Sequence, residues 1–366
     1  MYTHTKNKPV YKQIYDFISE GIHTGKFGNL EKLPSDGQLM VRFGASRTTV
    51  VKAMQELKLK GLIDRRPGSG SYVRLNDKKS NKLVSMIVAD VNDVEFFEYI
   101  CSSIASNCYN NELSLLWGTD YSSIVTNEKC AIELCQRYID MGVSGVFFAP
   151  CQLPGHNKLD MNSIITETLS SAGITVVLMD RDIVPFPIRS QFDLIGIDNY
   201  EAGFIQTQHL IERGCRRIIY ASRHGTVGTM SGRYAGYRYA LEMAGISFEK
   251  EWHQIGTATD IEFAKTILTH NPDGIACFHD PIAIELLNNF QKLNVCVPQK
   301  LKVIGLDDVK YSNYLTIPLS TLRQPCPKIG AQAVERMIRR LQGETGEPKQ
   351  ISFSATLIPR RSTDLV

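Results

Sequence analysis

The chain has 366 residues, of which 43% are hydrophobic, and a formal net charge of +3 at pH 7. This length is too great for one hydrophobic core, so we expect two or three domains in a protein of ordinary globular composition. The stretch MYTHTKNKPV lacks the apolar core of a secretory signal, and no run is long and apolar enough to cross a membrane, which indicates a cytoplasmic protein.

The charge is distributed unevenly along the chain. Residues 1–79 hold 15 Lys and Arg against 7 Asp and Glu, a net charge of +8. The remaining residues hold 26 against 31, a net charge of −5. A basic head on an acidic body favours a polyanion-binding module joined to a domain of a different kind.

The nine cysteines are odd in number, and no Cys-x-x-Cys pair occurs. Cys101 and Cys108 lie seven residues apart in an apolar stretch, a spacing typical of the buried face of a helix. We interpret most cysteines as reduced, buried side chains rather than disulfides or metal ligands. The sequence indicates no metal and no cofactor.

Three helices are predicted in the basic head. Pro9 opens the first, which extends to about residue 24 with an apolar face of Val10, Ile14, Phe17, Ile18 and Ile22. Ser35 begins the second, with Gln38 as its capping-box partner. Gly44 ends the second helix, and Ser46 caps the third.

The third helix has two chemically different faces. Its apolar positions follow the offsets i, i+3, i+4 and i+7 and comprise Val50, Ala53, Met54 and Leu57. The opposite side carries Arg47, Thr48, Lys52, Gln55 and Lys58. A tightly turned helix pair with a basic second member predicts a helix-turn-helix, whose N-terminal residues Arg47, Thr48 and Thr49 would enter the DNA major groove.

A basic hairpin follows the third helix. Leu62–Ile63 and Tyr72–Val73 predict short paired strands around RRPGSG, in which Gly68 and Gly70 permit a tight turn. Such a hairpin suits the DNA minor groove or its phosphates. A module that binds only another protein is the alternative, and the ordered succession of caps, turn and basic hairpin speaks against it.

The head resembles the winged helix-turn-helix of the GntR family of bacterial repressors over about residues 9–75. LPSDGQL is similar to the family's opening, FGASRTTVVKAMQEL to its turn and recognition helix, and GLIDRRPGSGSYV to its wing. The resemblance implies that Arg47 reads DNA, that Thr49 contacts a phosphate and that Gly68 lies at the wing tip. The expected DNA-binding residues are Ser35, Ser46, Arg47, Thr48, Thr49, Lys52, Arg65, Arg66, Gly68, Ser69 and Gly70.

Two positions differ from the usual pattern of the family. Gly37 and Val51 stand where the family often has arginine. Either Lys52 supplies a compensating contact or the operator sequence differs.

The segment RLNDKKSNK, residues 74–82, is polar and has no apolar periodicity, so we interpret residues 76–82 as a linker between a head of residues 1–75 and a body of residues 83–366. In the body, apolar strand-like runs alternate with helical patterns. The pattern LVSMIVA, LSLLW, GVFFAP and ITVVLMD forms one series, and the series DLIGIDN, RRIIYAS, GIACFHD and LKVIGLDD follows it. Two similar α/β halves with parallel sheets are therefore predicted.

Polar residues follow the ends of these strands, where ligands of parallel α/β sheets bind. They include Asn92 with Asp93, Trp117 with Asp120, Asp180 with Arg181, His279 with Asp280, and Asp307 with Asp308. Helix capping is an equal alternative for Asp280 and Asp308, but it explains the charge pair of Asp180 and Arg181 poorly. Alternating acceptors and forked donors suit a polyhydroxylated ligand, and Phe96 with Phe97 could stack on a sugar ring or belong to the core.

The body resembles the effector domain of the LacI family and the ribose-type periplasmic sugar-binding proteins over about residues 83–361. ITVVLMDRD, IGIDNYEAGFIQTQHLIERGCRRIIYAS, SGRYAGYRYALEMAGI and VIGLDDVKYSNYLTIPLSTLRQP carry the resemblance. It implies two doubly wound parallel-sheet lobes of the periplasmic-binding-protein-like type I, one of residues 83–190 and 323–342 and one of residues 191–322 and 343–366. The expected ligand-binding residues are Asn92, Phe96, Phe97, Asp180, Arg181, Arg233, His279, Asp307 and Gln324.

Two features of the body depart from these relatives. His279 stands where an Asn is common, which leaves open whether ligand binding depends on pH. The linker lacks the hinge helix of LacI repressors, so DNA binding should not require a hinge helix to fold.

Head and body together predict a transcriptional regulator with a small α+β winged helix-turn-helix domain. We expect a homodimeric repressor of carbohydrate-utilisation genes that binds palindromic operator DNA and is released by a monosaccharide. A non-sugar effector such as a nucleoside, or an activator, is the alternative. A transport protein and an enzyme are disfavoured, since no nucleophile elbow, phosphate loop or metal motif occurs and no catalytic residue is predicted.

Overall fold

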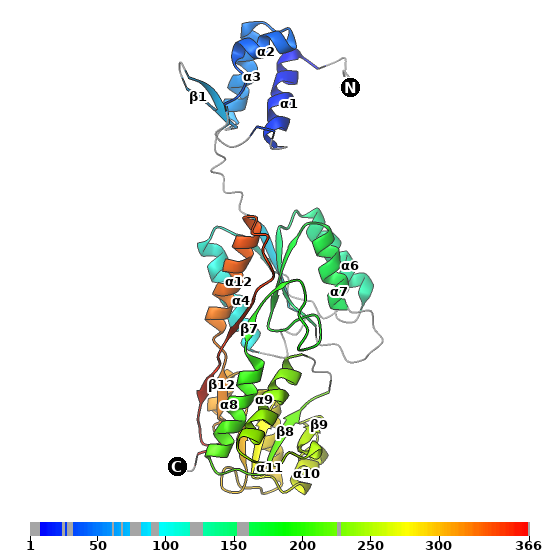
Figure 1. Ribbon diagram of the computed structural model, residues 1–366, viewed down its shortest axis with the longest axis vertical. Coiled ribbons are helices and arrows are strands. Elements are labelled where there is room, and N and C mark those ends of the chain that lie inside the picture. Colours follow the sequence, from blue (N-terminus) through cyan, green and yellow to red (C-terminus); the bar gives the residue numbers. More distant parts are fainter. Residues whose placement is uncertain are drawn as a thin grey trace. The chain divides into compact units, whose positions relative to one another are not determined.

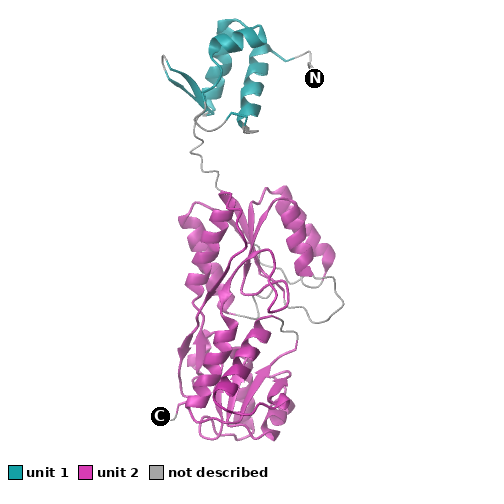
Figure 2. Cartoon of the chain, viewed as in Figure 1, with its two compact units in different colours: residues 1–81 teal, residues 82–366 magenta. Residues whose placement is uncertain are grey.

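The computed structural model describes residues 8–23, 26–27, 32–60, 62–66, 69–73, 82–88, 95–117, 127–151, 161–224 and 228–364. Contacts divide the chain into two compact units, residues 1–81 and 82–366 (Figure 2). Among the described residues, no helix has the length and apolar character needed to cross a membrane.

The N-terminal unit contains three helices and a hairpin (Figure 1). The helices are α1 (Val10–His23), α2 (Asp36–Phe43) and α3 (Arg47–Leu59), and the antiparallel hairpin joins β1 (Ile63–Arg66) to β2 (Gly70–Val73). Ile14, Ile18 and the four predicted apolar residues of α3 are fully buried. Val10 was expected in this core but is 38% exposed at the first residue of α1.

The predicted helix caps of this unit are confirmed. Ser35 and Gln38 form a reciprocal capping box at the start of α2, in which each side chain bonds the other residue's backbone N–H. Gly44 ends α2 in the left-handed conformation, with φ of 58°, and the Ser46 hydroxyl accepts the Thr49 N–H at the start of α3. These caps satisfy backbone groups that a helix leaves unpaired, and they fix the turn between α2 and α3.

The first lobe of the C-terminal unit is built on a six-stranded parallel sheet of order β13-β7-β6-β5-β3-β4. Its strands are β3 (Leu83–Val88), β4 (Ser114–Trp117), β5 (Gly145–Ala149), β6 (Thr175–Met179), β7 (Asp193–Ile197) and β13 (Gln350–Phe353). Helices α4 (Phe96–Asn110) and α12 (Cys326–Leu341) cover one face, and α6 (Glu128–Asp140) with α7 (Met161–Ser171) cover the other (Figure 1). The four inner strands β3, β5, β6 and β7 are buried on both faces, which explains their apolar sequences, whereas the edge strands β4 and β13 are partly exposed.

The second lobe contains a four-stranded parallel sheet of order β11-β10-β8-β9. Its strands are β8 (Ile218–Ser222), β9 (His253–Ile255), β10 (Gly274–Cys277) and β11 (Lys302–Ile304). Its helices are α8 (Asn199–Glu212), α9 (Thr229–Met243), α10 (Ile261–Thr269) and α11 (Asp280–Lys292), with short 3-10 turns η1 (Lys250–Trp252) and η2 (Lys310–Asn313). Gly203 lets α8 and α9 pack closely, since a Cβ there would lie 1.9 Å from the Arg233 carbonyl oxygen.

The boundaries of the two lobes differ from those expected. We expected residues 191–322 and 343–366 in the second lobe, but β7 pairs with β6 and β13 pairs with β7 in the first-lobe sheet. The chain therefore crosses near Asp198, near β12 (Thr321–Arg323) and just before β14 (Thr356–Ile358), which pairs with β12. DLIGI reads like the first strand of a new half because its apolar run precedes a capped helix, but only its hydrogen-bond partners decide its lobe.

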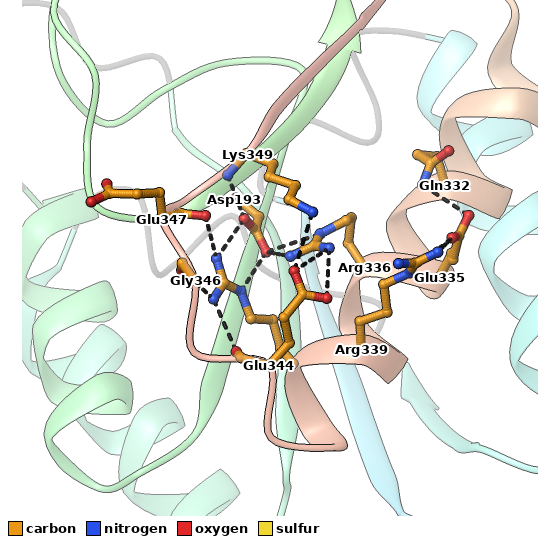
Figure 3. A network of polar contacts seen from close by, with 10 residues as sticks. Asp193, Gln332, Glu335, Arg336, Arg339, Glu344, Gly346, Glu347 and Lys349 are labelled. Carbon is orange, nitrogen blue, oxygen red and sulfur yellow. Dashed lines mark hydrogen bonds and ion pairs between the residues drawn. The ribbon is translucent and has the colours of Figure 1, made fainter.

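A buried ionic network holds three remote segments of the first lobe together (Figure 3). Asp193 at the start of β7 accepts hydrogen bonds from Arg336 and Arg340 of α12 and from the Lys349 N–H ahead of β13. Glu344 pairs with Arg336 from the loop after α12. The network thereby fixes the end of α12 and the path to β13, and no sequence pattern predicted it.

Candidate functional site

The exposed N-terminal end of α3 carries the expected DNA-reading residues. Arg47 is exposed and has no hydrogen-bond or ion-pair partner among the described residues. Thr48 and Thr49 lie beside it, with hydroxyls 2.9 and 2.8 Å from Ser46 Oγ. Lys52, one turn further, places its ammonium 4.4 Å from the Tyr11 ring centroid. The start of α3 therefore presents the Arg47 guanidinium, which has no partner among the described residues, next to the contacting hydroxyls of Ser46, Thr48 and Thr49.

The hairpin presents fewer free cations than expected. Arg65 forms an ion pair with Asp36 of α2 and is half-buried, so its charge ties the hairpin to the helix pair. Arg66 is exposed and lies 4.8 Å over the Tyr72 ring, and Ser69 Oγ lies 2.8 Å from the Tyr72 hydroxyl. Gly70 adopts φ of 120°, a conformation that favours glycine, and Gly68 lies outside the described residues.

In the C-terminal unit, eight of the nine expected ligand-binding residues can be placed. Each side chain ends a strand or begins a helix where the two lobes meet, and none is more than 7% exposed. The first lobe contributes Phe96, Phe97, Asp180 and Arg181, the second contributes Arg233, His279 and Asp307, and Gln324 follows the crossing strand β12. Asn92 lies outside the described residues, as do Asp93 and Asp120.

Several contacts bring these residues together. The Asp180 carboxylate accepts Arg181 Nε at 2.8 Å, and the Arg181 guanidinium carbon lies 5.9 Å from the Phe97 ring centroid. Phe96 and Phe97 stack on each other with centroids 4.4 Å apart. From the far side, Gln324 Nε2 donates to Asp307 Oδ1 at 2.7 Å. Both lobes therefore supply polar side chains and one supplies the aromatic pair.

Strained backbone accompanies two of the strand ends, those of β6 and β11. Asp180, Asp307 and Asp308 adopt φ of 68°, 118° and 54°, which non-glycine residues rarely adopt. Such conformations cost about 1–3 kcal/mol each and concentrate at binding sites.

Burial sets the protonation of two of these side chains. The pKa of His279 is lowered to about 3, chiefly by burial and also by Arg223 and Arg233, while its imidazole accepts the Ile282 N–H as the cap of α11. The pKa of Asp307 is raised to about 8 by burial, against the opposing effect of Arg233. At neutral pH His279 is therefore uncharged, and burial favours the protonated form of Asp307.

Asp280 and Asp308 have structural partners. Asp280 accepts hydrogen bonds from the Thr321 hydroxyl at 2.6 Å and the Val309 N–H at 3.0 Å. Asp308 pairs with Arg323 and Arg360, each at 2.6 Å. Neither caps the following helix by these bonds; instead both anchor the loop after β11 to the crossing segments.

Two cavities adjoin the cluster. One of about 210 Å³ is lined by Asp180, Arg181, Asn199, Thr229 and Gly232 among others. A second of about 430 Å³ is lined by Tyr99, Asp307, Lys310, Tyr314 and Gln324 among others. No group of His, Cys, Asp and Glu side chains within the described ranges could hold a metal ion.

Asn199 is a member of the cluster that sequence reasoning missed. Its side-chain oxygen accepts Arg233 Nε at 2.8 Å, while Arg233 Nη1 donates to the Phe278 carbonyl oxygen at 2.7 Å. These two bonds orient the guanidinium over the Phe278 ring at 4.5 Å. The polar pair Asp198-Asn199 after β7 was a signal of the same kind as Asp180-Arg181.

Comparisons with known proteins agree with both units. A model of the gntR family of bacterial regulatory proteins matches residues 10–73, and one of the periplasmic binding protein-like domain matches residues 207–363. The transcriptional repressor PurR of Vibrio vulnificus strain CMCP6 is 26% identical over 321 residues, which cover 85% of this chain and 90% of that protein. The arabinose metabolism transcriptional repressor of Halalkalibacterium halodurans is 26% identical over 389 residues, which cover 98% of this chain and 96% of that protein.

A solved structure shares the fold. The transcriptional regulator CelR, in complex with cellobiose, matches with a TM-score of 0.67 at 19% identity, over 97% of this chain and 100% of that chain.

A winged helix-turn-helix followed by a two-lobed parallel α/β body defines a DNA-binding transcriptional regulator. The family models show that the chain joins a GntR-family DNA-binding domain to a periplasmic-binding-protein-like domain. The predicted class of protein and its fold class are thereby confirmed.

Proposed function

We propose that this regulator is a repressor of carbohydrate-utilisation genes and that a monosaccharide bound between the lobes releases it from its operator. The observation that carries the proposal is the convergence of Asp180 and Arg181 from one lobe with Arg233 and Asp307 from the other. These groups offer both donors and acceptors, as sugar hydroxyls require. One relative is named for arabinose metabolism and one fold neighbour binds cellobiose, which supports a carbohydrate as the ligand.

The same proposal extends to the assembly. Two copies of the chain would form a homodimer and present two recognition helices to the half-sites of a palindromic operator. Ligand that favours one arrangement of the lobes would alter the separation of the heads, and the size of the response is set by its differential affinity for the two arrangements.

The first test is the thermal stability of the full-length protein against a panel of sugars. The panel comprises L-arabinose, D-ribose, D-xylose, D-glucose, cellobiose, two sugar phosphates and adenosine. A ligand at a hundred times its dissociation constant adds about 2.7 kcal/mol to the free energy of unfolding, which gives a clear rise in melting temperature. The sugar that raises it should then release the protein from operator DNA. A rise with adenosine alone would replace the sugar proposal by a nucleoside effector.

A further inference from the structure

Glu95 forms a contact between the lobes next to the proposed effector site. It directly precedes α4 and Phe96, yet its carboxylate makes no capping bond to its own helix. Both of its oxygens instead lie 3.2 Å from the backbone nitrogen of Lys310 in the loop after β11. Lys310 is three residues beyond Asp307. The contact therefore joins the segments that carry a ligand-binding residue in each lobe.

The Glu95 carboxylate and the Lys310 ammonium have different surroundings. The Glu95 side chain is 15% exposed and accepts the Tyr99 hydroxyl at 3.4 Å. The Lys310 ammonium is 65% exposed and lies 3.8 Å from the carboxylate. An exposed ion pair of that length contributes little, whereas the Lys310 N–H is shared between both oxygens of a mostly buried carboxylate, which is the more specific part of the contact.

We propose that Glu95 is a positioning residue of the effector site, which holds the two lobes closed by accepting the Lys310 backbone N–H across their junction. Glu95 touches none of the proposed ligand groups and acts on them through the closed arrangement. The apparent dissociation constant of a ligand that requires closure is its intrinsic dissociation constant divided by the fraction of closed molecules. Loss of the bond should lower that fraction, and effector binding should weaken about tenfold, a consequence that rests on the proposed function.

Hydrogen–deuterium exchange of the full-length protein, measured without any sugar, tests the contact itself. In Glu95→Ala the amides of residues 309–314 should exchange about tenfold faster, since Lys310 loses its acceptor, and the segment around His279 should follow as the lobes open. Glu95→Gln keeps a side-chain oxygen that can accept the N–H, so it should restore part of the protection.

Two further variants show which atoms matter. Lys310→Ala removes the ammonium but keeps the backbone N–H, so exchange should change little. Glu128→Ala removes an exposed acidic residue at the start of another first-lobe helix, α6, and should leave both segments unaffected.

Three results would overturn the proposal. The first is that exchange over residues 309–314 is unchanged in Glu95→Ala. The second is an equal rise in the exchange rate of these residues in Lys310→Ala. The third is a rise in the exchange rate that also includes the central strands β5 and β10, which would indicate general destabilisation. Because no sugar is present, these results do not depend on the identity of the effector. A panel in which no sugar binds would contradict the proposed function and leave the contact between the lobes standing.

Discussion

Asp193 accepts hydrogen bonds from Arg336 Nε at 3.2 Å and Nη2 at 3.0 Å, although the two residues are 143 positions apart. Both side chains are almost fully buried, at 1% and 2% exposure. Arg340 Nε adds a contact to the same carboxylate at 2.8 Å. The carboxylate is therefore the shared partner of two guanidinium groups that would otherwise repel each other beneath the surface.

Asp193→Asn should destabilise the C-terminal unit strongly. The amide keeps the shape of the side chain but removes the counter-charge of Arg340 and one of the two carboxylates that pair with Arg336. Breaking a buried ion pair in this way typically costs about 3 to 5 kcal/mol. Urea denaturation gives the free energy of unfolding. Glu335→Gln is the matched control, since its pair with Arg339 is half-exposed and should contribute less than about 1 kcal/mol.

The ion pair of Asp193 with Arg336 should also affect how the free energy of unfolding depends on pH. Burial opposes ionisation of Asp193, but hydrogen bonds from Arg340, Lys349 N–H and Arg336 outweigh it and lower its pKa. A lowered pKa gives stability that is present above the unfolded-state value and is lost as pH falls through the folded-state value. The difference between wild type and Asp193→Asn should therefore shrink in acid, and a constant difference would contradict the assignment.

His279 should make the stability of the protein fall in mild acid, but it should not act as a pH switch of the ligand site. Its folded-state pKa of about 3 lies below the unfolded value of 6.5, so below pH 6.5 only the unfolded state takes up the proton. Stability is then present above pH 6.5 and is lost as pH falls toward 3.

The variant His279→Asn isolates this effect, because Asn also caps helices well. Between pH 7 and pH 5 the wild type should lose about 2 kcal/mol relative to the variant. Asp280 and Asp307 titrate in both proteins and cancel in the difference. Equal pH profiles would mean that His279 is accessible to protons in the folded state.

Arg47→Ala should weaken operator binding severely while leaving the response of melting temperature to sugar intact. Arg47 is exposed, unpartnered among the described residues and located at the start of α3, so it is free to contact a base edge, an interaction worth about 1–3 kcal/mol. Lys58→Ala, near the other end of the same helix, is the control and should reduce affinity far less. Electrophoretic mobility shift at fixed salt gives both values, and equal losses would reject α3 as the recognition helix.

Local signals predicted the N-terminal unit well. Ser35, Gln38, Gly44 and Ser46 act on backbone groups within three or four residues, so their spacing alone indicates the helix limits. The structural partner of Arg65 could not be predicted from local sequence in this way. Its charge suited a phosphate, but its partner Asp36 lies 29 residues away and becomes a neighbour only when the hairpin folds back.

In the C-terminal unit too, contacts between residues far apart in the sequence could not be predicted. The strands and helices followed from apolar runs, but the lobe to which β7 belongs depends on its hydrogen bonds to β6 and β13. The strand-end rule pointed to Asp180, Arg181 and Asp307 because a parallel sheet places all its carboxyl ends at one edge, whereas Arg233 came only from the family resemblance. Asn199 obeys that rule too, whereas no spacing relates Asp193 to Arg336.

The cysteines should react with a thiol reagent according to burial. All nine are free thiols, of which Cys296 is exposed, Cys130 is half-buried and the other seven are buried. Burial raises the pKa of Cys101, Cys108 and Cys326 to about 12, so these thiols are protonated as well as inaccessible. One fast reaction, absent in Cys296→Ser, should precede a slow one, and all nine should react in denaturant. Fewer than nine would reveal a disulfide.

Arg233→Lys should separate effector binding from DNA binding. The guanidinium uses Nε for Asn199 and Nη1 for the Phe278 carbonyl, which aims its remaining nitrogen from a fixed position. A lysine keeps the charge but offers one ammonium in place of the planar fork, so it cannot make both bonds and still reach a hydroxyl. Affinity for the sugar that stabilises the wild type should fall at least about tenfold, with operator affinity unchanged.

The control for Arg233→Lys is Arg238→Lys on the same helix, where the guanidinium lies 5.0 Å over the Phe248 ring, away from the ligand cluster. Isothermal titration with the sugar and a mobility shift with operator DNA give the two affinities for each variant. If Arg233→Lys binds the sugar as tightly as Arg238→Lys does, the ligand does not contact Arg233 and the site must be placed elsewhere. If it binds neither sugar nor DNA, Arg233 holds the second lobe together rather than reading the ligand.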